Sequence, residues 1–196
     1  IKKYPTQKKL SEASEDQILA LWSGLGFYRR ARNIFKTKEI IKEEYNNRFP
    51  KEFHQLLELP GIGKSTAGAI MSLAYENPHP ILDGNVKRVI TRLVNKNIDL
   101  LKESQLWDLS SQFVNKENCF AYTQGIMDLG ATVCTPTNPS CKDCPVQNQC
   151  MSAFNIINNK KRNVAQLKKV IPMNLSLIQT EDSLLLVKNE ASSIWK

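Results

Sequence analysis

Four of the five cysteines in the chain lie close together, at Cys134, Cys141, Cys144 and Cys150, with gaps of six, two and five residues. Thiolates are soft ligands, and four at this spacing are typical of a metal site or an iron–sulfur cluster. Disulfides are the competing use, but the first residues lack a secretory pattern and reducing compartments disfavour disulfides. We therefore expect a cofactor-bearing intracellular protein.

A glycine-rich turn is the second candidate for chemistry. Between two helical patterns the sequence reads Gly61-Ile62-Gly63-Lys64-Ser65. A Gly-x-Gly turn lets the backbone approach a phosphate closely, and the free N–H groups that open the following helix point toward it. Such contacts would bind the nucleic-acid backbone without reading bases. The alternative is an ordinary corner between two helices.

The end of this turn imitates a nucleotide-binding Walker A loop, which the sequence excludes. A Walker A loop needs glycine five residues before Gly63, where the chain has Glu58. It also needs a preceding strand, whereas residues 52–59 have the pattern of a short helix.

Asp83 is placed as the N-cap of a helix that begins with Gly84-Asn85-Val86. A capping aspartate contributes about 1 kcal/mol, and that structural role is sufficient to account for it. A carboxylate close to a DNA-binding turn could also stabilise a developing cation.

An aromatic pair with a basic neighbour, Phe27-Tyr28-Arg29, follows the turn formed by Gly24 and Gly26. Aromatic side chains can enter a base stack while arginine holds phosphates. The alternative is that Phe27 packs in the core, but we expect at least one of the two rings to face solvent.

The charge of the chain favours a polyanionic partner. Lysine and arginine total 27 against 19 acidic residues, which gives a net charge of +8, and the sequence pI is about 9.3. Nucleic acid fits this charge, although a basic protein without such a partner has the same composition. The apolar fraction of 41% is enough for a core, and no apolar run approaches the roughly 18 residues of a membrane span. Because Ile1 is not methionine, we expect a fragment.

The elements that must position these residues are mostly short helices. A capping box at Ser14 predicts the first helix, and further helices are predicted at 28–45, 52–59, 64–75, from 83, 103–115 and 121–129. Residues 154–169 are polar and basic and are typical of a linker. Two apolar runs, 175–178 and 184–187, then predict a β-hairpin that would open a second, β-containing domain at 170–196.

Together these motifs resemble the MutY-type adenine DNA glycosylases of the helix-hairpin-helix superfamily, which also contains endonuclease III. The most specific parts are residues 59–69, 81–88 and 127–150. The resemblance implies a mainly α glycosylase domain at 1–153, with a 4Fe–4S cluster loop at 134–150. It implies the four clustered cysteines as ligands and excludes Cys119. Zinc is the alternative occupant, although structural zinc sites more often pair two Cys-x-x-Cys turns.

The resemblance also implies roles for single residues. Asp83 matches the catalytic aspartate that stabilises the cationic sugar as adenine leaves. Phe27 matches an aromatic wedge beside the lesion. Ser65 stands where endonuclease III has a nucleophilic lysine, so a monofunctional glycosylase is implied. Lys87 is a weaker candidate for a phosphate contact or an incidental sugar adduct. Residues 170–196 resemble the start of a Nudix-like domain that reads 8-oxoguanine.

The family's general acid, a glutamate that protonates the adenine, has no match in the sequence. We therefore expect the parent protein to excise adenine opposite 8-oxoguanine or guanine in duplex DNA, and this fragment to be inactive. An endonuclease III-like glycosylase and lyase, or a non-catalytic DNA-binding module with a structural metal loop, are the alternatives. We expect a cytoplasmic, nucleoid-associated bacterial monomer.

Overall fold

A computed structural model describes residues 2–155 as helices joined by short turns, with no strand in that range. The α-helices are α1 (Gln7–Ser11), α2 (Glu15–Leu21), α3 (Arg29–Glu44), α4 (Phe53–Glu58), α5 (Lys64–Ala74), α6 (Gly84–Leu93), α7 (Glu103–Phe113) and α8 (Cys119–Asp128). Shorter elements are the 3-10 turns η1 (Ile98–Leu100), η3 (Cys141–Asp143) and η4 (Gln147–Gln149), and the π-helical turn η2 (Leu129–Val133). The predicted linker beyond residue 155 and the predicted β-hairpin lie outside the described residues.

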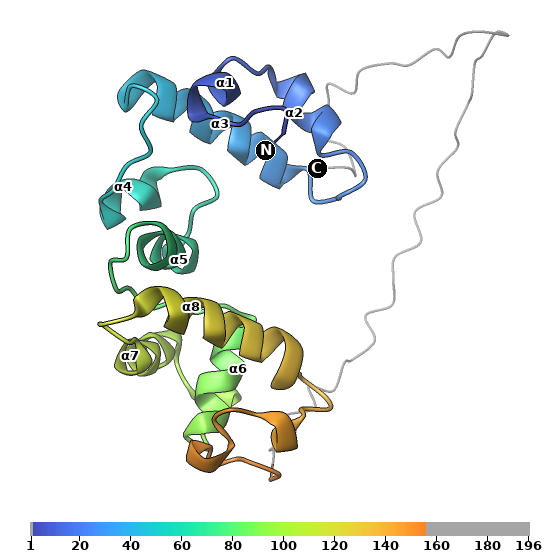
Figure 1. Ribbon diagram of the computed structural model, residues 1–196, viewed down its shortest axis with the longest axis vertical. Helices are drawn as coiled ribbons and strands as arrows, with labels where there is room; N and C mark the ends of the chain where they lie inside the picture. Colours follow the sequence, from blue (N-terminus) through green and yellow to red (C-terminus); the bar gives the residue numbers. More distant parts are fainter. Residues whose placement is uncertain (1, 156–196) are drawn as a thin grey trace, which may run out of the picture. The chain divides into compact units, whose positions relative to one another are not determined.

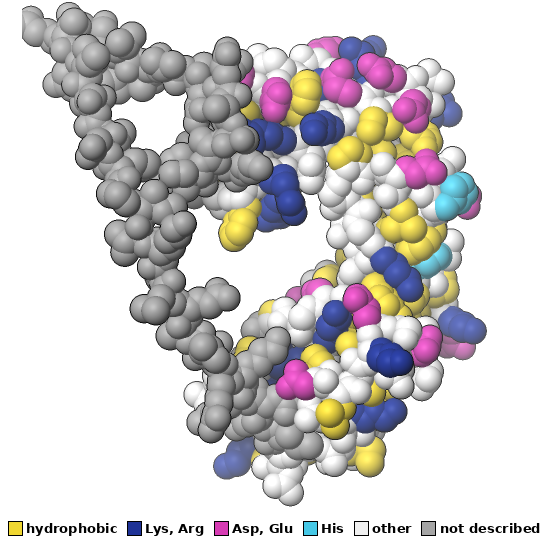
Figure 2. All heavy atoms as spheres, turned by 180° about the vertical axis from the view of Figure 1, so that it is seen from behind, with side chains coloured by type: hydrophobic (Ala, Val, Ile, Leu, Met, Phe, Trp, Pro, Cys, Tyr) yellow, Lys and Arg dark blue, Asp and Glu magenta, His cyan; other side chains and the backbone are white. Residues whose placement is uncertain are grey.

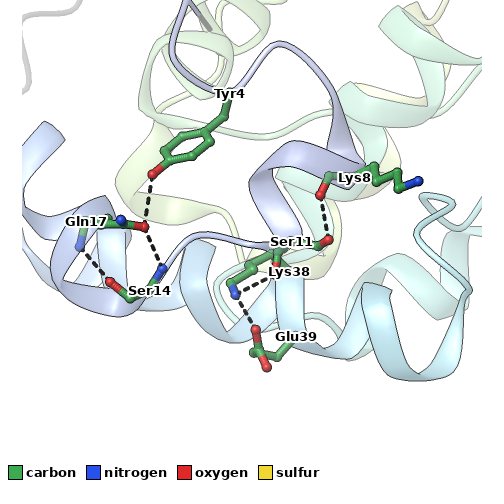
Figure 3. A network of polar contacts seen from close by, with 7 residues as sticks. All are labelled: Tyr4, Lys8, Ser11, Ser14, Gln17, Lys38 and Glu39. Atoms are coloured by element: carbon green, nitrogen blue, oxygen red, sulfur yellow. Dashed lines mark hydrogen bonds and ion pairs between the residues drawn. The ribbon is translucent and has the colours of Figure 1, made fainter.

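Helices α1, α2 and α3 are fastened by polar contacts (Figure 3). The predicted capping box is present: Ser14 Oγ accepts a hydrogen bond from the Gln17 amide at 3.2 Å, and Gln17 Oε1 accepts one from the Ser14 amide at 3.1 Å. Buried Lys38 of α3 donates to the Ser11 carbonyl at 3.1 Å and pairs with Glu39. The Lys38–Ser11 bond therefore ties α1 to α3, and the capping box fixes the start of α2.

Helices α6, α7 and α8 enclose the largest apolar cluster and lie together, with α5 beside α8 (Figure 1). Its buried members are Ile81, Leu82, Val86, Val89, Ile90, Leu106, Leu109 and Ile126. Ser110 of α7 donates to the Ile81 carbonyl at 2.7 Å. The segment that leads into α6 is therefore fixed both by burial and by a hydrogen bond.

Two glycines permit close approach of backbone around this core. A Cβ at Gly68 of α5 would lie 2.3 Å from the Pro80 carbonyl oxygen, and one at Gly130 of η2 would lie 2.7 Å from Asn85 Cβ. Gly68 lies between two other small residues, Ala67 and Ala69, and it is the one that allows this close approach. The first contact lies in the segment that precedes Asp83, and the second lies in the first turn of α6 that follows it.

The predicted helices are present with small shifts at their ends. The helix predicted at 121–129 begins earlier, at Cys119, because the Asn118 side chain accepts from the Ala121 amide at 3.0 Å and caps it there. The helix α1 and the π-helical turn η2 were not predicted. Within residues 2–155 no helix combines the length and apolarity needed to cross a membrane.

Candidate active site and cysteine loop

The glycine turn between α4 and α5 is braced from α3. Gly61 has φ +82°, and a Cβ there would lie 2.5 Å from Asn33 Nδ2. Thr37, one helical turn after Asn33, donates to the Pro60 carbonyl at 3.2 Å. Glycine is therefore required at position 61 by its backbone conformation and by the space available.

The start of α5 is open to an anion. Its N-cap, Gly63, has extended backbone (φ −89°, ψ 174°) and no side chain to satisfy the first amides of the helix. Gly63 and Lys64 are exposed, and Ile62 packs inward beside the cluster around Leu59. Unsatisfied N–H groups together with a cationic side chain form an anion-binding geometry.

Asp83 caps α6, as predicted, and the residue before it is hydrogen-bonded to the start of α5. Its Oδ1 accepts a hydrogen bond from the Val86 amide at 2.8 Å, while the residue stays exposed. The residue before it, Leu82, donates its amide to Ser65 Oγ at 2.9 Å. Ser65 thus joins the first turn of α5 to the residue that precedes Asp83.

Arg88 of α6 links Asp83's helix to the cysteine loop. Its guanidinium donates to the Cys134 carbonyl at 2.8 Å, the Gly130 carbonyl at 2.6 Å and Asn85 Oδ1 at 2.8 Å. Burial lowers the pKa of Arg88, but an arginine remains charged at neutral pH. A fixed cation therefore lies between α6 and the first cysteine.

Arg92, one turn further along α6, contacts the same end of the loop. It donates to Cys134 Sγ at 3.4 Å, the Thr135 carbonyl at 2.8 Å and the Pro136 carbonyl at 3.0 Å. The other end of the loop is held too, because the Met151 amide donates to the Leu93 carbonyl at 3.0 Å. Both ends of the cysteine loop are therefore tied to α6.

The four predicted ligands line a single cavity, together with Arg92 and loop residues. They are Cys134, Cys141, Cys144 and Cys150. Cys119 lies elsewhere, buried in α8 with its thiol 3.7 Å from the Ser72 carbonyl. None of the five forms a disulfide. In residues 2–155 no three His, Cys, Asp or Glu side chains gather closely enough to share one metal ion.

A family model described as "HhH-GPD superfamily base excision DNA repair protein" matches residues 1–108, which include the glycine turn, Ser65 and Asp83. The chain belongs to this superfamily. It is 42% identical over 202 residues to the adenine DNA glycosylase of Buchnera aphidicola subsp. Schizaphis graminum, covering 100% of this chain and 58% of that protein. It is 39% identical over 154 residues to the human adenine DNA glycosylase, covering 76% of this chain and 28% of the human protein. The chain thus spans little more than half the length of the bacterial relative.

Solved structures of the superfamily confirm the mainly helical, endonuclease III-like fold. One is described as a thermostable thymine-DNA glycosylase, with a TM-score of 0.70 and 27% identity over 79% of this chain and 72% of that one. Another is a non-covalent endonuclease III–DNA complex, with a TM-score of 0.66 and 25% identity over 78% of this chain and 72% of that one.

The aromatic pair of this HhH-GPD chain stands out from the surface. Phe27 is 82% exposed and Tyr28 44%, and Arg29 is exposed as well. Phe27 has φ 48°, a left-handed conformation that a bulky residue rarely adopts. The Trp22 indole donates to the Gly26 carbonyl at 2.9 Å and closes the preceding turn. The expectation that at least one ring faces solvent is confirmed, and both do.

Sequence reasoning missed several residues of the site in this superfamily member. Arg88 and Arg92 form an i, i+4 cationic pair that can be recognised in the sequence of the helix that Asp83 caps. No neighbouring residue indicates that these two side chains contact the cysteine loop. Lys64 and Lys87 contact Trp107 and Glu103 of α7. Figure 2 shows lysine and arginine side chains across the visible face, interspersed with acidic ones.

Proposed function

We propose that this chain is the glycosylase part of an adenine DNA glycosylase, which hydrolyses the N-glycosidic bond of adenine paired with 8-oxoguanine or guanine. The observation that carries the proposal is the joining of Asp83 to the glycine turn through the Ser65–Leu82 hydrogen bond. The fold alone does not identify the target base, because the solved structures that share it include both a thymine-DNA glycosylase and endonuclease III. The 42% identity to an adenine DNA glycosylase supports adenine.

Each candidate has a defined task in this reaction. The exposed amides and Lys64 at the start of α5 bind backbone phosphate, and Phe27 with Tyr28 and Arg29 supports the opened duplex from which the base is flipped. The bond from the sugar C1′ to adenine N9 then breaks with its electron pair leaving on the base. Asp83 stabilises the cationic sugar, a water oxygen bonds to C1′, and the proton that this water loses passes to the Asp83 carboxylate.

Ser65 supports hydrolysis over lyase chemistry. A Schiff base requires an amine, and a hydroxyl cannot form one. The Ser65 oxygen already accepts the Leu82 amide, which gives it a positioning role. We propose a monofunctional glycosylase, with Lys87 limited to phosphate contact or incidental sugar adducts.

The leaving adenine also needs a proton, and no glutamate of the 196 residues matches the position of the family's general acid. We propose that this chain as given binds DNA without excising the base. We further propose that residues 154–169 are a linker and that 170–196 begin a Nudix-like domain that reads 8-oxoguanine. Monomeric, nucleoid-associated action in the bacterial cytoplasm belongs to the same proposal.

We propose a 4Fe–4S cluster bound by Cys134, Cys141, Cys144 and Cys150. The donor set suits such a cluster, because all four cysteines line one cavity. Zinc is the alternative occupant, although structural zinc sites more often pair two Cys-x-x-Cys turns and only Cys141–Cys144 has that spacing. The cluster would supply a structural clasp for the loop.

The cofactor is tested on the purified chain. We expect brown protein with a broad absorption band near about 400 nm and iron and sulfide in equal amounts. A Cys119→Ser variant should keep the colour, and a Cys144→Ser variant should lose it. Colourless protein with one equivalent of zinc would contradict the cluster.

The activity is tested on the complete protein that the reading frame around these residues encodes. A duplex with adenine opposite 8-oxoguanine should release adenine and leave an intact abasic strand until alkali is added. Asp83→Asn should lower the single-turnover rate at least about 100-fold while duplex binding is kept. Release of thymine glycol with strand nicking, and no adenine release, would contradict the proposal.

A further inference from the structure

The first turn of α7 faces two lysines of the candidate site. Lys64, the first residue of α5, has its Nζ 4.1 Å from the centroid of the Trp107 ring. Lys87 of α6 has its Nζ 3.8 Å from Glu103 Oε1. Glu103 and Trp107 are four residues apart on α7 and therefore lie on one helix face. One face of α7 thus holds a cation from the glycine turn and a cation from the helix capped by Asp83.

The two contacts differ in what they do to the charge. The Trp107 ring carries no net charge, so it holds the Lys64 ammonium in place and leaves its charge available, and Lys64 stays exposed. Glu103 carries a carboxylate, which forms an ion pair with the Lys87 ammonium at 3.8 Å and offsets part of its charge. The Glu103 side chain is 73% exposed and that of Lys87 is 28% exposed, so the carboxylate can swing away at little cost.

We propose that this face of α7 tunes DNA-backbone binding: Trp107 positions Lys64 for a phosphate, and Glu103 competes with phosphate for Lys87. The inference rests on the proposed binding of duplex DNA by the glycine turn. A free lysine loses rotamer freedom when it binds a phosphate, and a lysine already held over a ring has less to lose. Trp107 and Glu103 are therefore positioning residues with opposite effects on affinity.

The test measures binding of the 196-residue chain to a fluorescent duplex over a series of salt concentrations. Trp107→Leu keeps an apolar group against the α6–α8 core but removes the π face, and should weaken binding at low salt about 3- to 10-fold. Trp107→Phe retains a ring and should restore most of the affinity. Glu103→Gln should tighten binding about 2- to 5-fold, and should steepen the salt dependence by about one released counterion.

Double variants identify the lysine through which each residue acts. Trp107→Leu should have no further effect in a Lys64→Met background, and Glu103→Gln none in a Lys87→Met background. If both α7 substitutions lower the affinity, and do so equally in the wild-type and the lysine-substituted backgrounds, α7 has only a structural role and the inference is overturned. Unchanged affinity in both would overturn it as well.

The wild-type chain separates this inference from the function on which it rests. If the wild-type chain binds the duplex but the α7 variants do not show the expected changes in affinity, the role of α7 is overturned and the proposed function stays intact. A wild-type chain that binds no duplex at any salt concentration overturns both. Thermal unfolding of each variant, with a midpoint close to wild type, ensures that the affinities compare folded proteins.

Discussion

At the scale of single residues, Gly61 and Gly63 occupy the same turn under different constraints. Gly61 has φ +82° and contacts Asn33, whereas Gly63 has φ −89° and no atom of the described residues within 4 Å of its missing Cβ. Gly61→Ala should therefore destabilise the chain by about 1 to 3 kcal/mol, and Gly63→Ala by less than about 0.5 kcal/mol. Urea unfolding of the two variants checks this.

Equal destabilisation by the two substitutions would show that the turn relaxes freely and that Asn33 does not brace it. A third variant, Asn33→Ala, makes the comparison sharper. It removes the side chain that a Cβ at position 61 would meet, so it should reduce the cost of Gly61→Ala toward that of the backbone conformation alone.

Single residues also show where sequence reasoning succeeds and fails. The cap at Asp83 was predictable because an N-cap is a local pattern, and its oxygen accepts the Val86 amide three residues on. The partner of Ser65 was not predictable, since Leu82 lies 17 residues away and their contact depends on packing of α5. Local chemistry can be read from the sequence, and long-range pairing cannot.

At the scale of elements, the packing of α5 against the segment before Asp83 depends on Gly68. A Cβ there would meet the Pro80 carbonyl at 2.3 Å, so Gly68→Ala should cost about 1 to 3 kcal/mol because backbone must move. Gly125 of α8 is a matched control, exposed and with open space around its missing Cβ. Gly125→Ala should stabilise the chain by about 0.5 to 1 kcal/mol. Thermal unfolding with both variants measures the difference in sign.

The same substitutions bear on the site, since Gly68 packs on Pro80, three residues before Asp83. If Gly68→Ala folds but the duplex affinity falls with no loss in Gly125→Ala, packing of α5 is coupled to binding. If Gly68→Ala and Gly125→Ala both stabilise the chain, or both destabilise it, the packing argument is contradicted.

Most helices were predictable from apolar periodicity and caps, and the exceptions have physical reasons. Helix α1 spans only Gln7–Ser11, too short for a periodic pattern, and is held by Thr6 and by Lys38 of α3. The π-helical turn η2 depends on Gly130, which packs on Asn85 and offers its carbonyl to Arg88. Each exception has a stabilising partner that is distant in sequence, Lys38 for α1 and Arg88 for η2.

At the scale of the whole described molecule, α6 connects the two candidate sites. Asp83 caps its beginning, Arg88 and Arg92 hold the first cysteine, and the Leu93 carbonyl holds the end of the loop. The spacing of the cysteines indicated a cofactor site, and the family resemblance implied all four as ligands. The four cysteines line one cavity, and their role as ligands stays a prediction. The connection to α6 could not be predicted, because a spacing pattern does not state what the loop packs against.

This connection predicts how the protein responds when the proposed cluster is removed. Without the group, the four thiols lose their common anchor, and the loop can hold α6 only through Arg88, Arg92 and Leu93. We expect amide hydrogen exchange to accelerate first in residues 134–151 and next in the last two turns of α6, since these are bonded to each other. Helices α1–α3 form a separate apolar cluster with their own contacts and should exchange at unchanged rates.

The measurement is hydrogen exchange with mass spectrometry on cluster-loaded and chelator-treated protein. A uniform acceleration over residues 2–155 would mean that the cluster stabilises the entire fold. Unchanged exchange in α6 would mean that the arginine contacts do not couple the loop to the helix that Asp83 caps.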